Sequence, residues 1–261
     1  MTGDELKGFF YEIFDASLPR LGPGDDASTR RALAELLAAG GGDGDGPGPA
    51  KLKALDLGCG NGAQTIELAK CLDGTIWAVD NHGPYLEELR RRAETRGVAD
   101  KIKPRQGDMA DLGLDEGSFE LIWSEGALYN VGFGRGLAIC RELLVPGGLL
   151  AASELTWLRP DPPDECRAFF ADEYPAMVDV AANLTIIREA GCELLGHFTL
   201  PESAWLDSYY LPLEARLGVL RERYAGDGER MGMIDSVQRE IDIYRQYLAY
   251  YGYEFFLMRR G

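Results

Sequence analysis

The sequence predicts an α/β fold built on a doubly wound, mostly parallel β-sheet with an antiparallel last strand. A short apolar run at 51–57 ends in a glycine-rich turn and is followed by apolar residues at helical spacing. Apolar runs and helical segments then alternate with short connections, which is typical of parallel sheets. The chain closes on an apolar run at 253–258 with no helix after it, and such a strand favours an antiparallel addition at the sheet edge.

Length and composition are those of a globular protein. The chain has 261 residues, enough to bury a full core, and 46% of them are hydrophobic and 27% charged. No apolar run reaches the length of a membrane span, and the first residues lack the apolar stretch of a signal peptide. We therefore expect a cytoplasmic protein without a membrane partner.

The charge balance is strongly acidic. The formal net charge is −16, from 43 acidic and 27 basic residues. Because nucleic-acid phosphates attract basic surfaces, we expect no nucleic-acid partner. The five cysteines are scattered without a Cys-x-x-Cys pair, and the chain has two histidines, so neither a disulfide framework nor a metal site is predicted.

The first fifty residues predict two helices and a loop. An apolar stripe within residues 1–20 predicts a helix that covers either the core or the mouth of a ligand site. A turn at 21–24 comes before a second helix that includes 30–39. Residues 40–50 are mainly glycine, aspartate and proline and predict a mobile loop. They lack the glutamate that closes an EF-hand loop, so no calcium site is expected there.

The glycine-rich turn after the first strand is the central feature of the sequence. Gly58, Gly60 and Gly62 let the backbone turn sharply and approach a ligand closely. The helix that follows directs its free N–H groups to the same place, which suits a nucleotide-like ligand with a carboxylate or a phosphate. Gly58-x-Gly60-x-x-Ala63 also fits the dinucleotide fingerprint, and a tight turn that binds nothing is a further alternative.

Acidic residues follow three of the predicted strands. Asp80 ends the strand at 75–79, about twenty residues past the glycine turn, where a carboxylate can accept hydrogen bonds from both ribose hydroxyls. The alternative role of Asp80 is to cap the next helix. Asp108 follows the strand at 102–106 and could accept a hydrogen bond from the amine of adenine, or lie solvated in a loop. Glu125 follows the strand at 119–124.

The remainder of the chain continues the alternation and then becomes helical. Further expected elements are helices at 84–96, 132–144 and 181–190 and strands at 149–155 and 192–200. Two segments rich in aromatic residues interrupt the pattern, at 157–180 and 201–250. We divide the chain into N-terminal helices with a flexible loop (1–49), an α/β core (50–200), a helical cap insertion (201–250) and the final strand of the core sheet (251–261).

Together these residues resemble the class I S-adenosylmethionine-dependent methyltransferases of the small-molecule type. The run Leu55-Asp56-Leu57-Gly58-Cys59-Gly60-Asn61-Gly62 resembles the first motif of that family, and Asp80 the second. Asp108-Met109 resembles the adenine-contacting position, and Pro146-Gly147-Gly148 the turn before the fifth strand. The stretch 123–130 and the turn at 22–24 resemble an uncharacterised bacterial and archaeal subgroup.

The resemblance implies a Rossmann-like, seven-stranded sheet that binds S-adenosylmethionine and releases S-adenosylhomocysteine. It implies a small-molecule acceptor methylated on N, O or C, and it leaves a homodimer open. The residues implied to bind the cofactor are Asp56, Gly58, Gly60, Asn61, Gly62, Asp80, Asn81, Asp108, Met109, Ser124 and Glu125.

Methyl transfer from a sulfonium requires mainly proximity and alignment, so no catalytic triad is expected. A base is needed only where the acceptor begins protonated. The candidate catalytic residues are Glu125, Tyr129 and His197, with Glu154 and Tyr11 as further candidates. His197 could instead be a core histidine, and Tyr129 could pack against the following helix.

The two aromatic segments predict a cover over the substrate that would enclose an apolar or a cationic acceptor. A helical core or a dimer face would explain the same residues. Two other functions are considered for the whole chain, a nicotinamide-dependent oxidoreductase and a protein that binds S-adenosylmethionine without catalysis.

Overall fold

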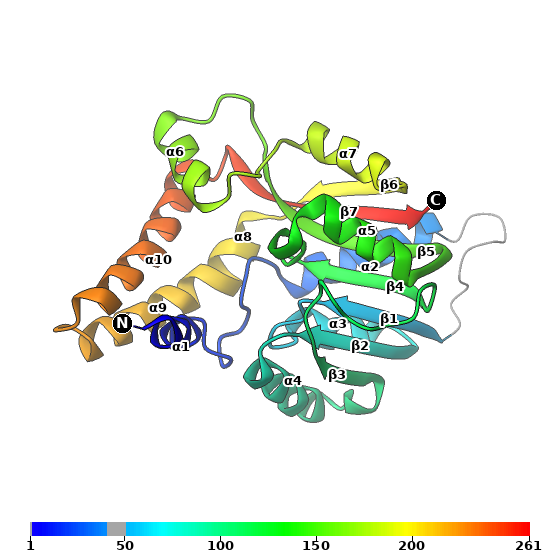
Figure 1. Cartoon of the computed structure of the whole chain (residues 1–261), viewed down its shortest axis with the longest axis horizontal. Coiled ribbons are helices and arrows are strands. Elements are labelled where there is room, and N and C mark those ends of the chain that lie inside the picture. Colours follow the sequence, from blue (N-terminus) through cyan, green and yellow to red (C-terminus); the bar gives the residue numbers. More distant parts are fainter. Residues whose placement is uncertain (1, 41–50) are drawn as a thin grey trace.

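The computed structural model of the chain describes residues 2–40 and 51–261 (Figure 1). Almost all of the glycine-rich stretch 40–50, predicted to be a mobile loop, lies outside the described residues. Within the described part, the strands are β1 (Leu52–Leu57), β2 (Gly74–Asp80), β3 (Ile102–Gln106), β4 (Phe119–Glu125), β5 (Leu144–Trp157), β6 (Cys192–Thr199) and β7 (Tyr251–Arg260). These strands form one sheet in the order β3-β2-β1-β4-β5-β7-β6.

The sheet is parallel from β3 to β5, and β7 is antiparallel to both of its neighbours. The predicted antiparallel last strand is therefore confirmed, but its predicted place at the edge is wrong. Strand β7 lies between β5 and β6, which leaves β6 at the edge. Since it pairs on both sides, β7 is buried from Tyr251 to Met258, and this explains its unbroken apolar sequence.

Ten α-helices and three short helical turns accompany the sheet in the described residues. The helices are α1 (Gly3–Ile13), α2 (Asp26–Gly40), α3 (Ala63–Cys71), α4 (Gly83–Arg96), α5 (Phe133–Leu143), α6 (Asp164–Glu173), α7 (Val180–Glu189), α8 (Glu202–Trp205), α9 (Leu211–Arg223) and α10 (Gly228–Tyr247). The short turns are η1 (Ala99–Lys101), η2 (Leu128–Val131) and η3 (Leu206–Tyr210), of which η3 is one turn of π-helix.

Helices cover both faces of the sheet. Successive residues of a strand point to opposite faces, so Phe255 and Phe256 of β7 belong to two different apolar clusters. One cluster joins the sheet to α2, α3 and α4, and the other joins it to α5 and α7. The doubly wound α/β fold predicted from the sequence is thereby confirmed.

The predicted N-terminal helix over 1–20 is too long, because α1 ends at Ile13. The backbone N–H and the hydroxyl of Ser17 both donate to the Asp15 carboxylate, at 3.0 and 2.5 Å. Such local side-chain bonds compete with helical ones. The chain from residue 14 to residue 24 is consequently irregular, and we call it the N-terminal cover, since it lies across the glycine turn.

Helices α8, α9 and α10 lie beyond the end of the sheet toward which β4 points, and α1 lies beside α9 (Figure 1). Parallel strands end at this side of the sheet, where ligands of open α/β folds bind. No helix among the described residues is both long enough and apolar enough to span a membrane.

Candidate functional site

A cavity of about 790 Å³ lies at the carboxyl ends of the parallel strands. Its volume falls in the range of small-molecule sites. The glycine turn, the N-terminal cover, the ends of β2, β3 and β4, and residues of α6, α8, η3, α10 and β7 line it. Among the residues predicted from the sequence, those that line the cavity are Tyr11, Gly58, Gly60, Asn61, Asp80, Asn81, Asp108, Met109, Glu125 and Tyr129.

The three glycines of the turn serve different purposes. All have positive φ, 71° at Gly58, 52° at Gly60 and 83° at Gly62. A Cβ at Gly58 would lie 2.3 Å from the Cβ of Ala127, and one at Gly62 would lie 2.1 Å from Leu89. These two glycines therefore allow close packing within the protein, and Gly62 does not line the cavity. At Gly60, a Cβ would approach Leu21 of the N-terminal cover at 3.1 Å.

Asp80 lies at the end of β2 and holds the glycine turn in place. One carboxylate oxygen accepts a hydrogen bond from the Gly60 N–H and the other from the His82 N–H, both at 2.9 Å. Burial raises the pKa of this carboxyl. Each carboxylate oxygen can accept a second hydrogen bond, so Asp80 keeps acceptor capacity toward the cavity. Its neighbour Asn81 is exposed at the cavity rim.

Asp108 and Met109 lie in the loop after β3, at the side of the cavity formed by β2 and β3. Asp108 is exposed and accepts a hydrogen bond from the Ala110 N–H at 2.8 Å. Met109 packs close to the glycine turn, because a Cβ on Gly58 would lie 3.4 Å from its terminal methyl carbon. The pair thus combines an acceptor with an apolar surface.

Two predicted cofactor residues lie in the interior and do not line the cavity. Asp56 is fully buried and accepts from the Thr65 hydroxyl at 2.6 Å, which joins β1 to α3. Burial raises the pKa of Asp56 to about 7. Ser124 is also fully buried and donates to the Leu57 carbonyl at 2.9 Å, which joins β4 to β1. Both residues therefore support the strands beneath the cavity.

Glu125 lines the cavity, but protein groups occupy both of its oxygens. Oε2 accepts from Arg20 at 3.0 Å, and Oε1 accepts from Thr29 at 2.7 Å and from Trp123 at 2.9 Å. Arg20 is buried and also pairs with Asp26 at 3.1 Å. Glu125 is thus an anchor for the N-terminal cover and for α2, and this geometry does not support the predicted role as a base.

Side-chain amide and guanidinium groups hold the N-terminal cover onto the glycine turn. The Asn61 amide donates to the carbonyls of Ala16 and Leu18 at 3.0 and 2.7 Å. Arg92 of α4 donates to the same two carbonyls and to that of Pro19. The Asn61 amide nitrogen therefore positions the cover, and because Asn61 also lines the cavity, its contact with a cofactor stays a prediction.

The remaining candidates for proton transfer differ in their access to the cavity. Tyr129 is 44% exposed, and its ring lies 5.9 Å from that of Tyr174. The Tyr174 hydroxyl donates to Glu154 Oε1 at 2.5 Å, and Tyr174 lines the cavity. Glu154 is buried, which raises its pKa to about 7, and its Oε2 has no hydrogen-bond partner among the described residues.

His197 lies outside the cavity, on the edge strand β6. Its Nδ1 is 2.5 Å from Glu254 Oε1, and the Thr199 hydroxyl donates to Glu254 Oε2 at 2.6 Å. Because the His197 imidazole faces Glu254 and does not line the cavity, this geometry does not support its predicted catalytic role.

Two further residues of the site were not predicted from the sequence. Arg20 pairs with Asp26 and Glu125, and Glu240 lines the cavity and accepts a hydrogen bond from Tyr210. Arg20 meets Glu125, and Glu240 meets Tyr210, only in the folded chain.

The chain is similar to known methyltransferases in the region of the glycine turn. Residues 54–148 match the family described as "Methyltransferase domain". The chain is 29% identical to the sterol 24-C-methyltransferase erg6 of Aspergillus fumigatus over 171 residues, which cover 61% of this chain and 44% of that protein. It is 27% identical to the 27-O-demethylrifamycin SV methyltransferase of Amycolatopsis mediterranei over 199 residues, which cover 73% and 69%. The chain thus spans less than half the length of the sterol relative.

Two solved structures share the fold over almost the whole chain. One is a SAM-dependent methyltransferase from Geobacter sulfurreducens in complex with S-adenosyl-L-homocysteine, with a TM-score of 0.77 and 19% identity, covering 97% of this chain and 98% of that chain. The other, from Thiobacillus denitrificans and in complex with the same compound, has a TM-score of 0.76 and 20% identity over the same shares.

The interior position of Asp56 predicts a pH dependence of stability. The folded carboxyl keeps its proton up to about pH 7, whereas in the unfolded chain it loses the proton near pH 4. Relative to an Asp56→Asn variant, the wild type should therefore be most stable below about pH 4 and lose stability as the pH rises toward 7. Chemical denaturation of both proteins between these pH values measures the difference. The exposed Asp73→Asn variant is the control, and a flat difference for Asp56→Asn would contradict the prediction.

The ion pair between Arg20 and Glu125 predicts a large effect of one substitution. Arg20→Met leaves Glu125 buried without its cation, so the free energy of unfolding should fall by about 3–5 kcal/mol. The exposed pair of Arg31 and Glu35 supplies the control, because Glu35→Gln removes this pair, leaves Arg31 over the Phe198 ring and should cost less than about 1 kcal/mol. Equal stability of the two variants, measured by urea denaturation, would show that the Arg20 pair is not an anchor.

Proposed function

We propose that this chain, which carries a class I S-adenosylmethionine-dependent methyltransferase domain, transfers a methyl group from that cofactor to a small-molecule acceptor. The observation that carries the proposal is the cavity over the glycine turn with Asp80 at its rim. The match of residues 54–148 supports it, and so do the two structural relatives in complex with S-adenosylhomocysteine.

The chemistry of the cavity suits this cofactor. Asp80 retains acceptor sites for the ribose hydroxyls, and Asp108 with Met109 offers an acceptor and an apolar surface for adenine. Helix α3 begins at Ala63, and the preceding Gly62 provides no side-chain cap, so the first N–H groups of the helix are available to the carboxylate of the methionine moiety. The bound cofactor supplies a methyl group on a positively charged sulfur.

The charge of the cavity disfavours the nicotinamide alternative. Its lining contains five carboxylates and one guanidinium, those of Asp80, Asp108, Glu125, Glu173, Glu240 and Arg20. The guanidinium is already paired with Glu125 and Asp26. A pyrophosphate would therefore enter a negative site with no free cation among the described lining residues, whereas a sulfonium would be attracted.

The chain itself would exclude water and position the acceptor. The N-terminal cover closes one side of the cavity, and Tyr129 presents an exposed ring at another. Glu154, whose pKa is about 7, is linked to the cavity through the Tyr174 hydroxyl. We assign to this pair the removal of a proton from an acceptor that binds protonated.

Calorimetric titration tests the cofactor. S-adenosylmethionine and S-adenosylhomocysteine should bind, and NAD should not. Asp80→Ala should weaken both affinities at least about tenfold, because the ribose hydroxyls lose their proposed acceptor and the glycine turn loses the bond from the Gly60 N–H. The exposed Asp73→Ala variant, which removes a carboxylate outside the cavity, is the control. NAD binding in place of S-adenosylhomocysteine would overturn the proposal, and unchanged affinity of Asp80→Ala would refute the ribose assignment.

Release of S-adenosylhomocysteine in the presence of a panel of acceptors tests turnover. The wild-type rate should rise as the pH increases through about 7, where Glu154 ionises, and Glu154→Gln should lose that rise and slow about 100-fold. Affinity for S-adenosylhomocysteine should not change in this variant, since Glu154 does not line the cavity. Binding without turnover across the panel would instead favour a non-catalytic binding protein.

A further inference from the structure

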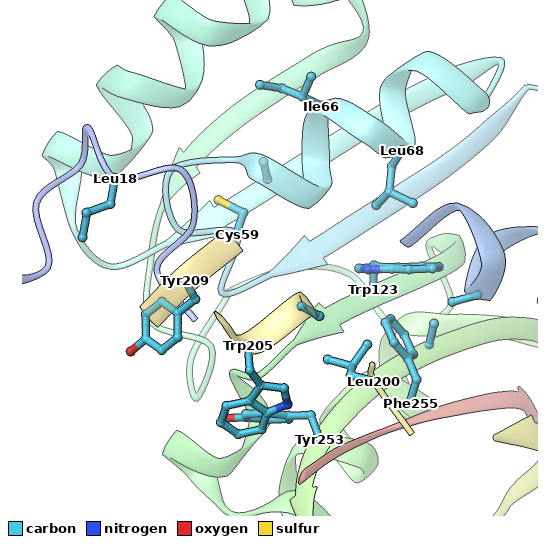
Figure 2. Packing of buried hydrophobic residues seen from close by; sticks show 14 of the residues in the cluster. Leu18, Cys59, Ile66, Leu68, Trp123, Leu200, Trp205, Tyr209, Tyr253 and Phe255 are labelled. Atoms are coloured by element: carbon cyan, nitrogen blue, oxygen red, sulfur yellow. The ribbon is translucent and has the colours of Figure 1, made fainter. Parts of the chain in front are cut away.

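The part of the cavity that faces the helical segments is a chamber of aromatic rings. We call it the aromatic chamber and define it by Tyr129, Phe170, Trp205, Tyr209, Tyr251 and Tyr253, all of which line the cavity. Trp205 lies against Tyr253 with a centroid separation of 5.3 Å, and Tyr209 lies on the same side of the glycine turn (Figure 2). Phe170 and Tyr251 meet edge to face at 4.5 Å. Five separate elements thus supply rings to one space.

One carboxylate projects into this chamber from α10. Glu240 Oε1 accepts a hydrogen bond from the Tyr210 hydroxyl at 2.9 Å. Its other oxygen makes no hydrogen bond to the described residues, and none of their cationic groups lies within ion-pair distance of Glu240. Burial of the Tyr209 and Tyr251 hydroxyls is the main cause that raises their pKa values, and the negative charge of Glu240 is the second cause. The acid is therefore surrounded by rings and has no counter-charge.

A second polar group in the chamber also lacks a partner. The Tyr251 hydroxyl is buried, with 1% of the residue exposed, and has no hydrogen bond among the described residues. A buried hydroxyl without a partner destabilises the folded protein, and desolvation raises the pKa of the half-buried Glu240 carboxyl, which disfavours its ionised form. An apolar acceptor would leave both groups unsatisfied. A ligand with a positively charged donor would satisfy both.

We propose that the aromatic chamber binds the ammonium group of an amine-bearing acceptor, with Glu240 as its counter-charge. The aromatic rings contribute cation–π attraction, which is strongest for desolvated cations. The Tyr251 hydroxyl accepts one N–H of the ammonium group. This inference rests on the proposed function, because it names the class of acceptor. Carboxylate and phosphate acceptors do not fit this inference, because they offer Glu240 no positive charge and an ionised Glu240 repels them.

The test is calorimetric titration of the full chain saturated with S-adenosylhomocysteine. The probes are benzylamine, 2-phenylethylamine and tryptamine, each with the alcohol and the carboxylate of the same skeleton. At least one amine should bind, at least tenfold more tightly than its alcohol, and the carboxylates should not bind. Glu240→Gln keeps the size of the side chain and its acceptor for Tyr210, so it should weaken amine binding at least tenfold and leave the alcohol unaffected.

The matched control is Asp242→Asn on the same helix, which removes one exposed carboxylate outside the cavity and should leave amine affinity unchanged. The thermal midpoint of Glu240→Gln should equal or exceed that of the wild type, because an uncharged amide of the same size replaces a half-buried carboxyl whose ionised form desolvation disfavours. A lower midpoint with unchanged amine affinity would mean that Glu240 serves the fold.

The remaining outcomes separate this inference from the proposed function. Failure of S-adenosylhomocysteine to bind would refute the function. Normal binding of that compound with no amine bound, or with the carboxylates bound equally well, would refute only the amine subsite. If Glu240→Gln weakened the binding of S-adenosylmethionine but not that of S-adenosylhomocysteine or the amines, the Glu240 carboxylate would be the counter-charge of the sulfonium. This result would also overturn the inference.

Discussion

Strand β7 runs antiparallel between β5 and β6, and the arrangement of the site depends on its direction. Tyr251 at the start of β7 pairs with Trp157 at the end of β5, so β7 begins where the parallel strands finish. Strand β6 ends on that side too, with Thr199 opposite Glu254. The chain between β6 and β7 must therefore leave and re-enter the sheet at one end, and α8, α9 and α10 lie beyond that end of the sheet (Figure 1).

The same direction brings β7 into the site. Tyr251 and Tyr253, at the start of the internal strand β7, line the cavity together with residues of helices that are far away in sequence. A Cβ on Gly126 would lie 3.3 Å from the Tyr253 hydroxyl, so the loop after β4 and the start of β7 are in close contact. An edge position for β7 would have left this contact unmade. The pairing of one strand thus joins the cofactor side of the cavity to the aromatic chamber.

Sequence patterns predicted the features that depend on neighbouring residues. The strand and turn up to Gly62 and the position of Asp80 after β2 follow from local spacing. Roles that depend on distant partners did not follow. Glu125 is held by Arg20, 105 residues earlier, and Tyr210 donates to Glu240, 30 residues later. No local pattern distinguishes an acid that meets a guanidinium from one that meets a phenol. Glu125 was therefore expected to be a base, and Glu240 was not predicted as a site residue.

The two halves of the cavity are closed by different segments that are tied together. Asn61 and Arg92 hold the N-terminal cover over the glycine turn, whereas α8 and η3 bring rings to the aromatic chamber. The Gly24 N–H donates to the Ala204 carbonyl at 3.1 Å, directly before Trp205. Because one backbone bond joins the end of the N-terminal cover to the residue before Trp205, the segment that closes the glycine turn and the segment that brings rings to the aromatic chamber are in direct contact. The two ends of the cavity are therefore bounded by parts of the chain that are connected to each other as well as to the sheet.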